Sequence, residues 1–195
     1  MEAVKRECIL VEATKAFARF GFKKASIDTI AEWAGVGKGT VYLAAESKQD
    51  LFYQVLHREV VAWIAEVQKI VDPRVPAEQL LAQASLQGEA YLNDRPLLKQ
   101  LLFGEAYKLM PEWSDRLDAL VALGRQNVDS ILRLGVQQGR FRNDLDVEAT
   151  GELLLDLQLA YFTLHDRPGP DRQARLDRRR IAAFKLILDG VLVRP

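Results

Sequence analysis

The residues best suited to chemistry lie close together near the start of this 195-residue chain. Lys38, Thr40 and Tyr42 place a positive charge, a hydroxyl and a phenol within five positions. Such groups can hydrogen-bond to phosphate oxygens and to the polar edges of bases. They can bind one ligand together only if a rigid helix or strand exposes them on the same side. The structure of the neighbouring segments is therefore needed to predict their role.

The segment before these residues has the pattern of a short amphipathic helix. Ile27, Ile30 and Ala34 recur at spacings of three and four, which a period of 3.6 residues places on one face. Ser26 is suited to cap the start of this helix, and Gly35 can take the left-handed conformation that ends it. Two short helices around a glycine turn predict a helix-turn-helix, whose second helix enters a DNA groove.

Other chemistries have little support in the sequence. Gly35, Gly37 and Gly39 alternate, but no strand precedes them and their spacing does not match the known phosphate-binding loops. The two histidines, His57 and His165, lack neighbouring cysteines or carboxylates at metal-ligand spacing. Their scarcity also argues against acid–base or nucleophilic catalysis. We therefore expect no metal, no cofactor and no enzymatic activity.

The composition is that of a globular protein: 49% hydrophobic, 28% charged, without an apolar run near the roughly 18 residues of a membrane span. The charged start lacks the apolar region of a signal peptide, so we expect a cytoplasmic protein. The net charge is zero, and the first fifty residues hold eight Lys and Arg against seven Asp and Glu. DNA contacts would depend on placement rather than on bulk charge. Cys8, the single cysteine, is expected to be half-buried on the first helix.

Helical periodicity runs almost from end to end, and no segment requires a sheet, so the predicted fold is all-α. Ser47 is a suitable N-cap for a long helix that the prolines of residues 72–76 end. Pro96 suits the first turn of a helix, and Gly139 suits the end of one. The expected helices span about residues 2–20, 26–34, 37–43, 48–71, 77–92, 96–109, 112–138, 147–165 and 171–192.

The last two predicted helices are apolar on more than one face. A helix that is apolar on two sides needs two packing partners. A symmetric dimer, in which two such helices from each subunit form a four-helix bundle, would provide the second partner. The alternative is that neighbouring helices of the same chain cover both faces.

The N-terminal block combines several motifs in a fixed order. They are Ala13-Thr-Lys-Ala-Phe17, Gly21-Phe22, Ser26-Ile27, Ile30-Ala31, Ala34-Gly35-Val36, Lys38-Gly-Thr-Val-Tyr42, Ser47-Lys48 and Asp50-Leu51-Phe52. With a weaker match over residues 139–149, the chain resembles a TetR/AcrR-type transcriptional regulator over nearly its whole length. The resemblance implies a three-helix DNA-binding domain over residues 1–50 and a helical effector-binding and dimerisation domain over residues 51–195. It also implies a homodimeric repressor that binds a palindromic operator and is released by a small-molecule effector.

The resemblance further implies which residues contact the double-stranded DNA operator. The recognition helix would span Gly37 to Leu43, with Lys38 and Thr40 facing the groove or its phosphates. Tyr42 would contact one phosphate, and Lys48, at the start of the long helix, another. The full expected set is Ser26, Thr29, Gly37, Lys38, Gly39, Thr40, Tyr42, Leu43 and Lys48.

Four positions depart from the family pattern and keep a second interpretation open. Gly37 stands where relatives have Ser or Thr, Ala44 where they have His or an aromatic residue, and Ala45 where they have Phe. Glu46 adds a negative charge near the expected phosphate path. The alternative is a helical ligand-binding or interaction protein whose degenerate helix-turn-helix binds DNA weakly or not at all.

Aromatic and polar residues on otherwise apolar segments are candidates for an effector pocket. Such mixtures line ligand sites, although each aromatic residue alone also fits ordinary core packing. The resemblance implies a small apolar or amphipathic effector. The candidates are Tyr91, Phe103, Tyr107, Trp113, Asn127, Gln158, Phe162 and His165.

Overall fold

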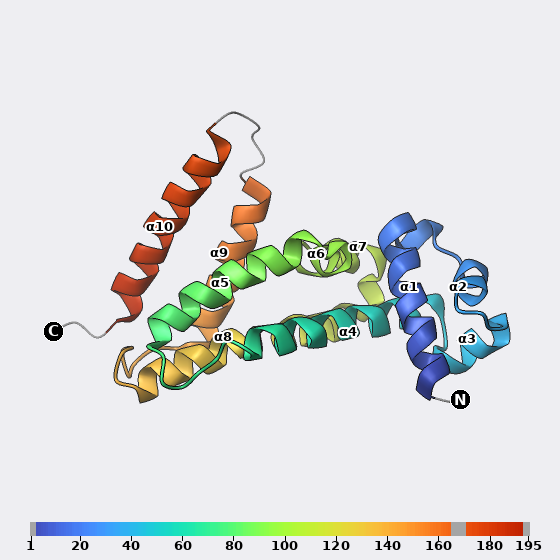
Figure 1. Cartoon of the computed structure of the whole chain (residues 1–195), viewed down its shortest axis with the longest axis horizontal. Helices are drawn as coiled ribbons and strands as arrows, with labels where there is room; N and C mark the ends of the chain where they lie inside the picture. Colours follow the sequence, from blue (N-terminus) through green and yellow to red (C-terminus); the bar gives the residue numbers. More distant parts are fainter. Residues whose placement is uncertain (1–2, 165–170, 193–195) are drawn as a thin grey trace. The chain divides into compact units, whose positions relative to one another are not determined.

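The structure, a computed structural model, describes residues 3–164 and 171–192. Over these ranges the fold is all-helical, and a single isolated bridge pairs Phe141 with Leu192. Figure 1 shows the helices in chain order. They are α1 (Ala3–Lys24), α2 (Ile27–Trp33), α3 (Lys38–Ala44), α4 (Lys48–Gln68), α5 (Ala77–Asn93), α6 (Pro96–Leu102), α7 (Glu105–Leu109), the 3-10 helix η1 (Pro111–Trp113), α8 (Ser114–Gln137), α9 (Val147–Leu164) and α10 (Arg172–Val191).

Two compact units make up the chain. The first unit comprises Met1–Trp63 and Leu92–Gly124, and the second comprises Ile64–Tyr91 and Arg125–Pro195. The functional division into residues 1–50 and 51–195 stays a prediction.

An aromatic core holds the first unit together. The ring of Phe52 on α4 lies edge-on to that of Phe17 on α1, with centroids 5.0 Å apart, and Phe22 lies 5.1 Å from Phe52. Helix α1 packs against α2, α3 and α6. Ile30 and Val41 are the inward-facing residues of α2 and α3, and both are fully buried. The two short helices are therefore fixed by their apolar sides, which leaves their opposite sides exposed.

The core of the second unit is built from α5, α8, α10 and the loops beside them. Phe141 lies directly against Gly135, where any side chain on α8 would collide with the ring. The side chain of Gln138 accepts a hydrogen bond from the backbone N–H of Ala77 (3.0 Å) and donates one to the carbonyl of Pro73 (2.9 Å). Gln138 thus ties the end of α8 to the proline-containing loop before α5.

Most predicted elements are confirmed, with three corrections. The expected helix over residues 96–109 is two helices, because Gly104 takes a left-handed conformation (φ 74°) between α6 and α7. Helix α4 ends at Gln68, a few residues before the position we expected. Cys8 is exposed rather than half-buried, with its thiol 3.7 Å from the carbonyl of Ala34.

The capping predictions are confirmed where the structure tests them. Ser47 Oγ accepts a hydrogen bond from the N–H of Asp50 (3.0 Å) at the start of α4. Pro96 lies in the first turn of α6, and Gly139 follows α8 with a φ of 67°. Gly21 breaks α1 with a φ of 72°, although helical residues continue to Lys24. Among the described helices, none combines the length and apolar character needed to cross a membrane.

Candidate nucleic-acid interface

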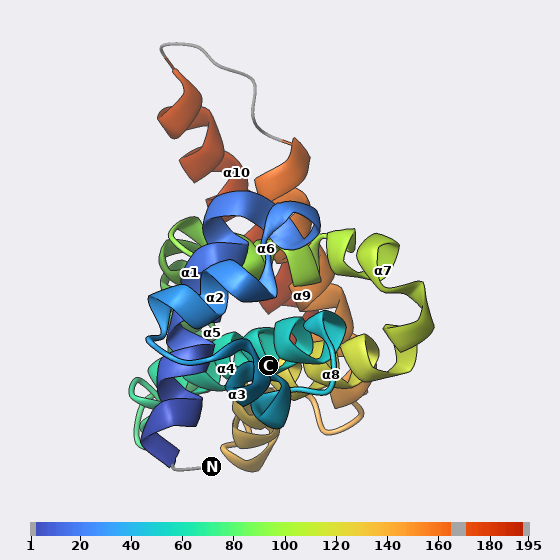
Figure 2. The ribbon, with the colours of Figure 1, turned by 90° about the vertical axis from the view of Figure 1, so that its right-hand side faces the viewer.

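The turn between α2 and α3 has the geometry that the sequence predicts. Ser26 caps α2 by accepting a hydrogen bond from the N–H of Thr29 (3.0 Å). Gly35 takes a left-handed conformation, with a φ of 64°. Behind it, the N–H of Val36 donates to the carbonyl of Ala31 (3.0 Å) and closes the turn. Figure 2 looks onto α2 and α3, which lie beside α1.

Helix α3 is buried on one side and exposed on the other. Val41 is 1% exposed, whereas Tyr42 is 47% and Leu43 is 77% exposed. Gln54 on α4 supports the end of the helix, because its side-chain amide donates to the carbonyl of Ala44 (3.0 Å). The exposed side of α3 is therefore held rigidly on the first unit.

Lys38, the first residue of α3, forms an ion pair across the turn. Its ammonium lies 3.0 Å from the carboxylate of Asp28 on α2. The hydrogen bond and the charge of Asp28 raise the pKa of Lys38 above its ordinary value. Both side chains are largely exposed, so the pair is open to competition from another anion.

Lys48, the first residue of α4, is held more tightly than a typical surface lysine. Its ammonium donates a hydrogen bond to the carbonyl of Lys23 (3.1 Å) and lies 4.8 Å from the ring centre of Phe22. Partial burial lowers the pKa of Lys48 from its ordinary value. The side chain joins the start of α4 to the end of α1.

The remaining expected DNA contacts lie on α2 and α3 or at the ends of these helices. Gly37 is the N-cap of α3, and Gly39 is exposed within it. Thr40 is half-buried, as are Ser26 and Thr29. The hydroxyls of Ser26 and Thr29 hydrogen-bond to each other at 2.8 Å, so both have a partner within the protein.

The effector candidates are divided between the two units. Phe103, Tyr107 and Trp113 belong to the first unit. The hydroxyl of Tyr107 donates to Asp118 (2.7 Å), and burial together with this carboxylate raises the pKa of the phenol. Trp113 lies beneath the guanidinium of Arg116, 4.1 Å from the ring centre.

The other candidates belong to the second unit. Asn127 is buried and donates to the carbonyl of Ile64 (3.3 Å), and Gln158 donates to the carbonyl of Ser85 (3.1 Å). Tyr91 is half-buried. The side chain of Phe162 and the whole of His165 lie outside the described residues.

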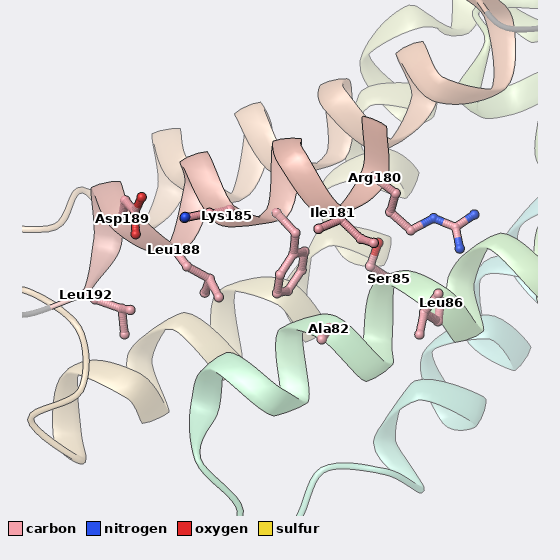
Figure 3. A pocket seen from close by; sticks show the side chains of 10 residues that line it. Ala82, Ser85, Leu86, Arg180, Ile181, Lys185, Leu188, Asp189 and Leu192 are labelled. Atoms are coloured by element: carbon pink, nitrogen blue, oxygen red, sulfur yellow. The ribbon is translucent and has the colours of Figure 1, made fainter. Parts of the chain in front are cut away.

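A groove of about 380 Å³ lies between α5 and α10 in the second unit. Figure 3 shows Ile181 and Leu188 of α10 facing it, with Arg180 and Lys185 among the charged residues beside them. Its floor on α5 includes Ala82. Of the effector candidates whose side chains the structure describes, none lines this groove.

Two buried polar atoms of the first unit are features that the sequence alone does not predict. Trp63 is 6% exposed, and its Nε1 has no hydrogen-bond partner among the described residues. The side-chain oxygen of Gln100 is likewise buried without a described partner. The ring of Trp63 packs on Gly124, where an added Cβ would lie 3.0 Å from it. A sequence shows neither the burial of such atoms nor their lack of partners.

The fold and the exposed second helix of the turn define a helix-turn-helix DNA-binding protein. Comparison with known proteins narrows this class. The model of the family described as bacterial regulatory proteins, tetR family, matches residues 9–55. The HTH-type transcriptional repressor KstR2 of Mycolicibacterium smegmatis is 27% identical over 97% of this chain and 91% of its own. The regulator YhgD of Bacillus subtilis is 30% identical over 43% of this chain and 44% of its own.

Solved structures share the fold over the whole chain. A TetR-family regulator from Mesorhizobium loti superposes with a TM-score of 0.75 at 22% identity, covering 98% of both chains. The regulator FadR of Bacillus subtilis, solved in complex with stearoyl-CoA, gives a TM-score of 0.63 at 19% identity, over 94% of this chain and 98% of that one. The N-terminal segment of this chain is therefore a DNA-binding domain of the tetR family, and the chain is similar over nearly its whole length to transcriptional regulators of that family.

Proposed function

We propose that this protein is a homodimeric repressor that binds a palindromic operator in the cytoplasm and is released by an amphipathic effector. The main support is that α3 is buried on one side and exposed on the other. Val41 fixes the helix in the core, and the opposite side exposes Lys38, Tyr42 and Leu43. In a dimer, two such helices would enter successive major grooves, about 34–36 Å apart. An effector that binds only a state in which the two α3 helices are spaced differently would weaken operator binding. The extent of the weakening is set by the difference between the effector's affinities for the two states.

The proposed DNA contacts follow from the positions of the side chains. Lys38 and Tyr42 are one turn apart on α3 and would bind phosphates, with Lys48 adding a contact at the start of α4. The positive end of the α4 dipole favours an anion at that place. Ser26 and Thr29 would present their paired hydroxyls at the start of α2. The remaining proposed contacts are Gly37, Gly39, Thr40 and Leu43.

The proposed dimer is formed by α9 and α10. Among the side chains that the structure describes on these helices, three large apolar ones are exposed in the single chain: Leu153 on α9, and Ile181 and Leu186 on α10. Exposed apolar residues spread over two long helices favour a protein partner, and a second copy would form the four-helix bundle expected from the sequence.

The proposed effector is a molecule with an apolar chain and a polar head. The stearoyl-CoA complex of the structurally similar FadR supports this class. Buried polar atoms normally have hydrogen-bond partners, and a polar group of the effector would supply one for Trp63 Nε1 and Gln100 Oε1. Phe103, Tyr107 and Trp113 are the aromatic candidates of the same unit. The candidates of the second unit are Tyr91, Asn127, Gln158, Phe162 and His165.

Selection of bound genomic fragments with the purified full-length protein tests operator binding. We expect enrichment of fragments with a palindromic sequence, and binding that weakens steeply with salt because phosphate contacts release counterions. Failure to enrich any fragment would favour the alternative, a helical ligand-binding protein whose degenerate helix-turn-helix has lost DNA binding.

Release by the effector has its own test. Stearoyl-CoA should dissociate the protein from its operator, whereas free CoA, which lacks the apolar chain, should not. Trp63→Phe replaces the indole with a smaller aromatic ring that has no N–H. This variant should bind the operator normally and need more stearoyl-CoA for release. Equal release of both proteins would exclude Trp63 from the effector site.

A further inference from the structure

The exposed side of α3 is divided into two strips of different chemistry. Lys38 and Tyr42 are one turn apart and form a strip with an ammonium and a phenol. Gly39 and Leu43, also one turn apart, form a second strip that has no hydrogen-bonding side chain. At 3.6 residues per turn the second strip lies roughly opposite the buried Val41, so it points most directly outward.

Gly39 has no structural requirement within the described chain. Its φ is not left-handed, and a Cβ built on it meets nothing within 4 Å. Glycine weakens a helix interior relative to alanine, so it is an unfavourable choice for a short helix. A glycine of this kind allows another molecule to approach the helix backbone closely.

Leu43 sits beside this glycine as the most exposed apolar residue among those described on α3. In the major groove, guanine, adenine and cytosine present donors and acceptors that a leucine cannot pair, whereas thymine also presents its 5-methyl group. We propose that Leu43 recognises a thymine methyl group in each half-site, an inference that rests on the proposed operator binding. Gly39 allows α3 to come close enough for this contact.

The experiment uses an operator obtained from the fragment selection and replaces its thymines one at a time with deoxyuridine, which lacks only the 5-methyl group. At one position in each half-site, the wild-type protein should bind about threefold to fivefold more weakly, which corresponds to the loss of one buried methyl group. A cytosine at that position should also weaken binding, and 5-methylcytosine should restore part of it.

Protein variants connect this effect to Leu43. Leu43→Ala should bind the thymine and deoxyuridine operators equally, whereas Leu43→Met, which keeps an apolar chain, should retain the preference. Val61→Ala removes a partly exposed apolar side chain on α4 and should behave as wild type. Circular dichroism checks that all variants stay helical.

The outcomes separate this inference from the proposed function. If no fragment is enriched, the operator-binding proposal fails. If an operator is bound but every deoxyuridine substitution is neutral, recognition of a methyl group is wrong while operator binding stands. Retention of the full preference by Leu43→Ala would likewise overturn the role of Leu43.

Discussion

Helices α3 and α10 expose leucines to nearly the same degree, yet their surroundings differ. Leu43 on α3 is 77% exposed and Leu186 on α10 is 75% exposed. Leu43 lies in a seven-residue helix beside Lys38 and Tyr42, whereas α10 is 20 residues long and also exposes Ile181. One apolar side chain among polar groups suits a DNA groove, and several along a long helix suit a protein surface. Exposure alone therefore does not identify a function, but the chemistry of the neighbours does.

The largest expected effect comes from placing charges on α10. The double variant Ile181→Glu, Leu186→Glu should be monomeric in analytical ultracentrifugation, because it would bury carboxylates in the proposed interface. Loss of bivalent binding should weaken operator binding by about 100-fold or more in a mobility-shift assay. Val61→Glu, a charge at an exposed apolar position on α4, is the control and should stay dimeric. A dimeric double variant would remove α10 from the interface.

Loss of the polar strip on α3 should have the next largest effect. Tyr42→Phe removes only a hydroxyl and should weaken operator binding by about tenfold if that hydroxyl binds a phosphate. Lys38→Ala should weaken binding to all sequences. It should also reduce the slope of log affinity against log salt concentration by about one, because one fewer counterion is released. Helicity and dimerisation should be unchanged in both, since the side chains are exposed. Unchanged affinity in both variants would contradict the assigned contacts.

Gly39→Ala should change stability and binding in opposite directions. Alanine should stabilise the fold by up to about 1 kcal/mol, measured by chemical denaturation, because it favours a helix interior. Operator binding should nevertheless weaken, since the added methyl group would keep α3 away from the groove. Improved operator binding by Gly39→Ala would argue against close approach.

The smallest effect is expected from Asp28. Asp28→Asn removes the carboxylate that lies 3.0 Å from the ammonium of Lys38. Operator binding should become about twofold to threefold tighter, because exposed ion pairs are weak and a phosphate would no longer compete with Asp28. The measurement is a titration of labelled operator at several salt concentrations. Weaker binding would mean that Asp28 positions Lys38 instead of competing for it.

Periodicity and glycine positions predict most of the helices and the turn between α2 and α3. Ser26, Gly35 and Ser47 act locally, so their roles as cap, turn and cap could be read from adjacent residues. The break at Gly104 was missed because apolar residues continue on both sides of it, and only the backbone conformation separates α6 from α7.

Features of the candidate site that depend on distant contacts could not be predicted. The ion pair of Lys38 with Asp28 joins residues ten positions apart across the turn. The indole nitrogen of Trp63 has no partner among the described residues, and this depends on how three-dimensional packing surrounds it. Likewise, the two units draw on separated stretches of chain, so the effector candidates divide between them in a way that sequence order does not reveal.

Lys48 has a consequence for the entropy of DNA binding. A free lysine loses about 2 kcal/mol of rotamer entropy when a ligand immobilises it. In Lys48 the ring of Phe22 and the carbonyl of Lys23 already restrict the side chain. Much of the rotamer entropy of Lys48 is therefore already lost on folding, so a phosphate that binds there loses less entropy in ordering this side chain.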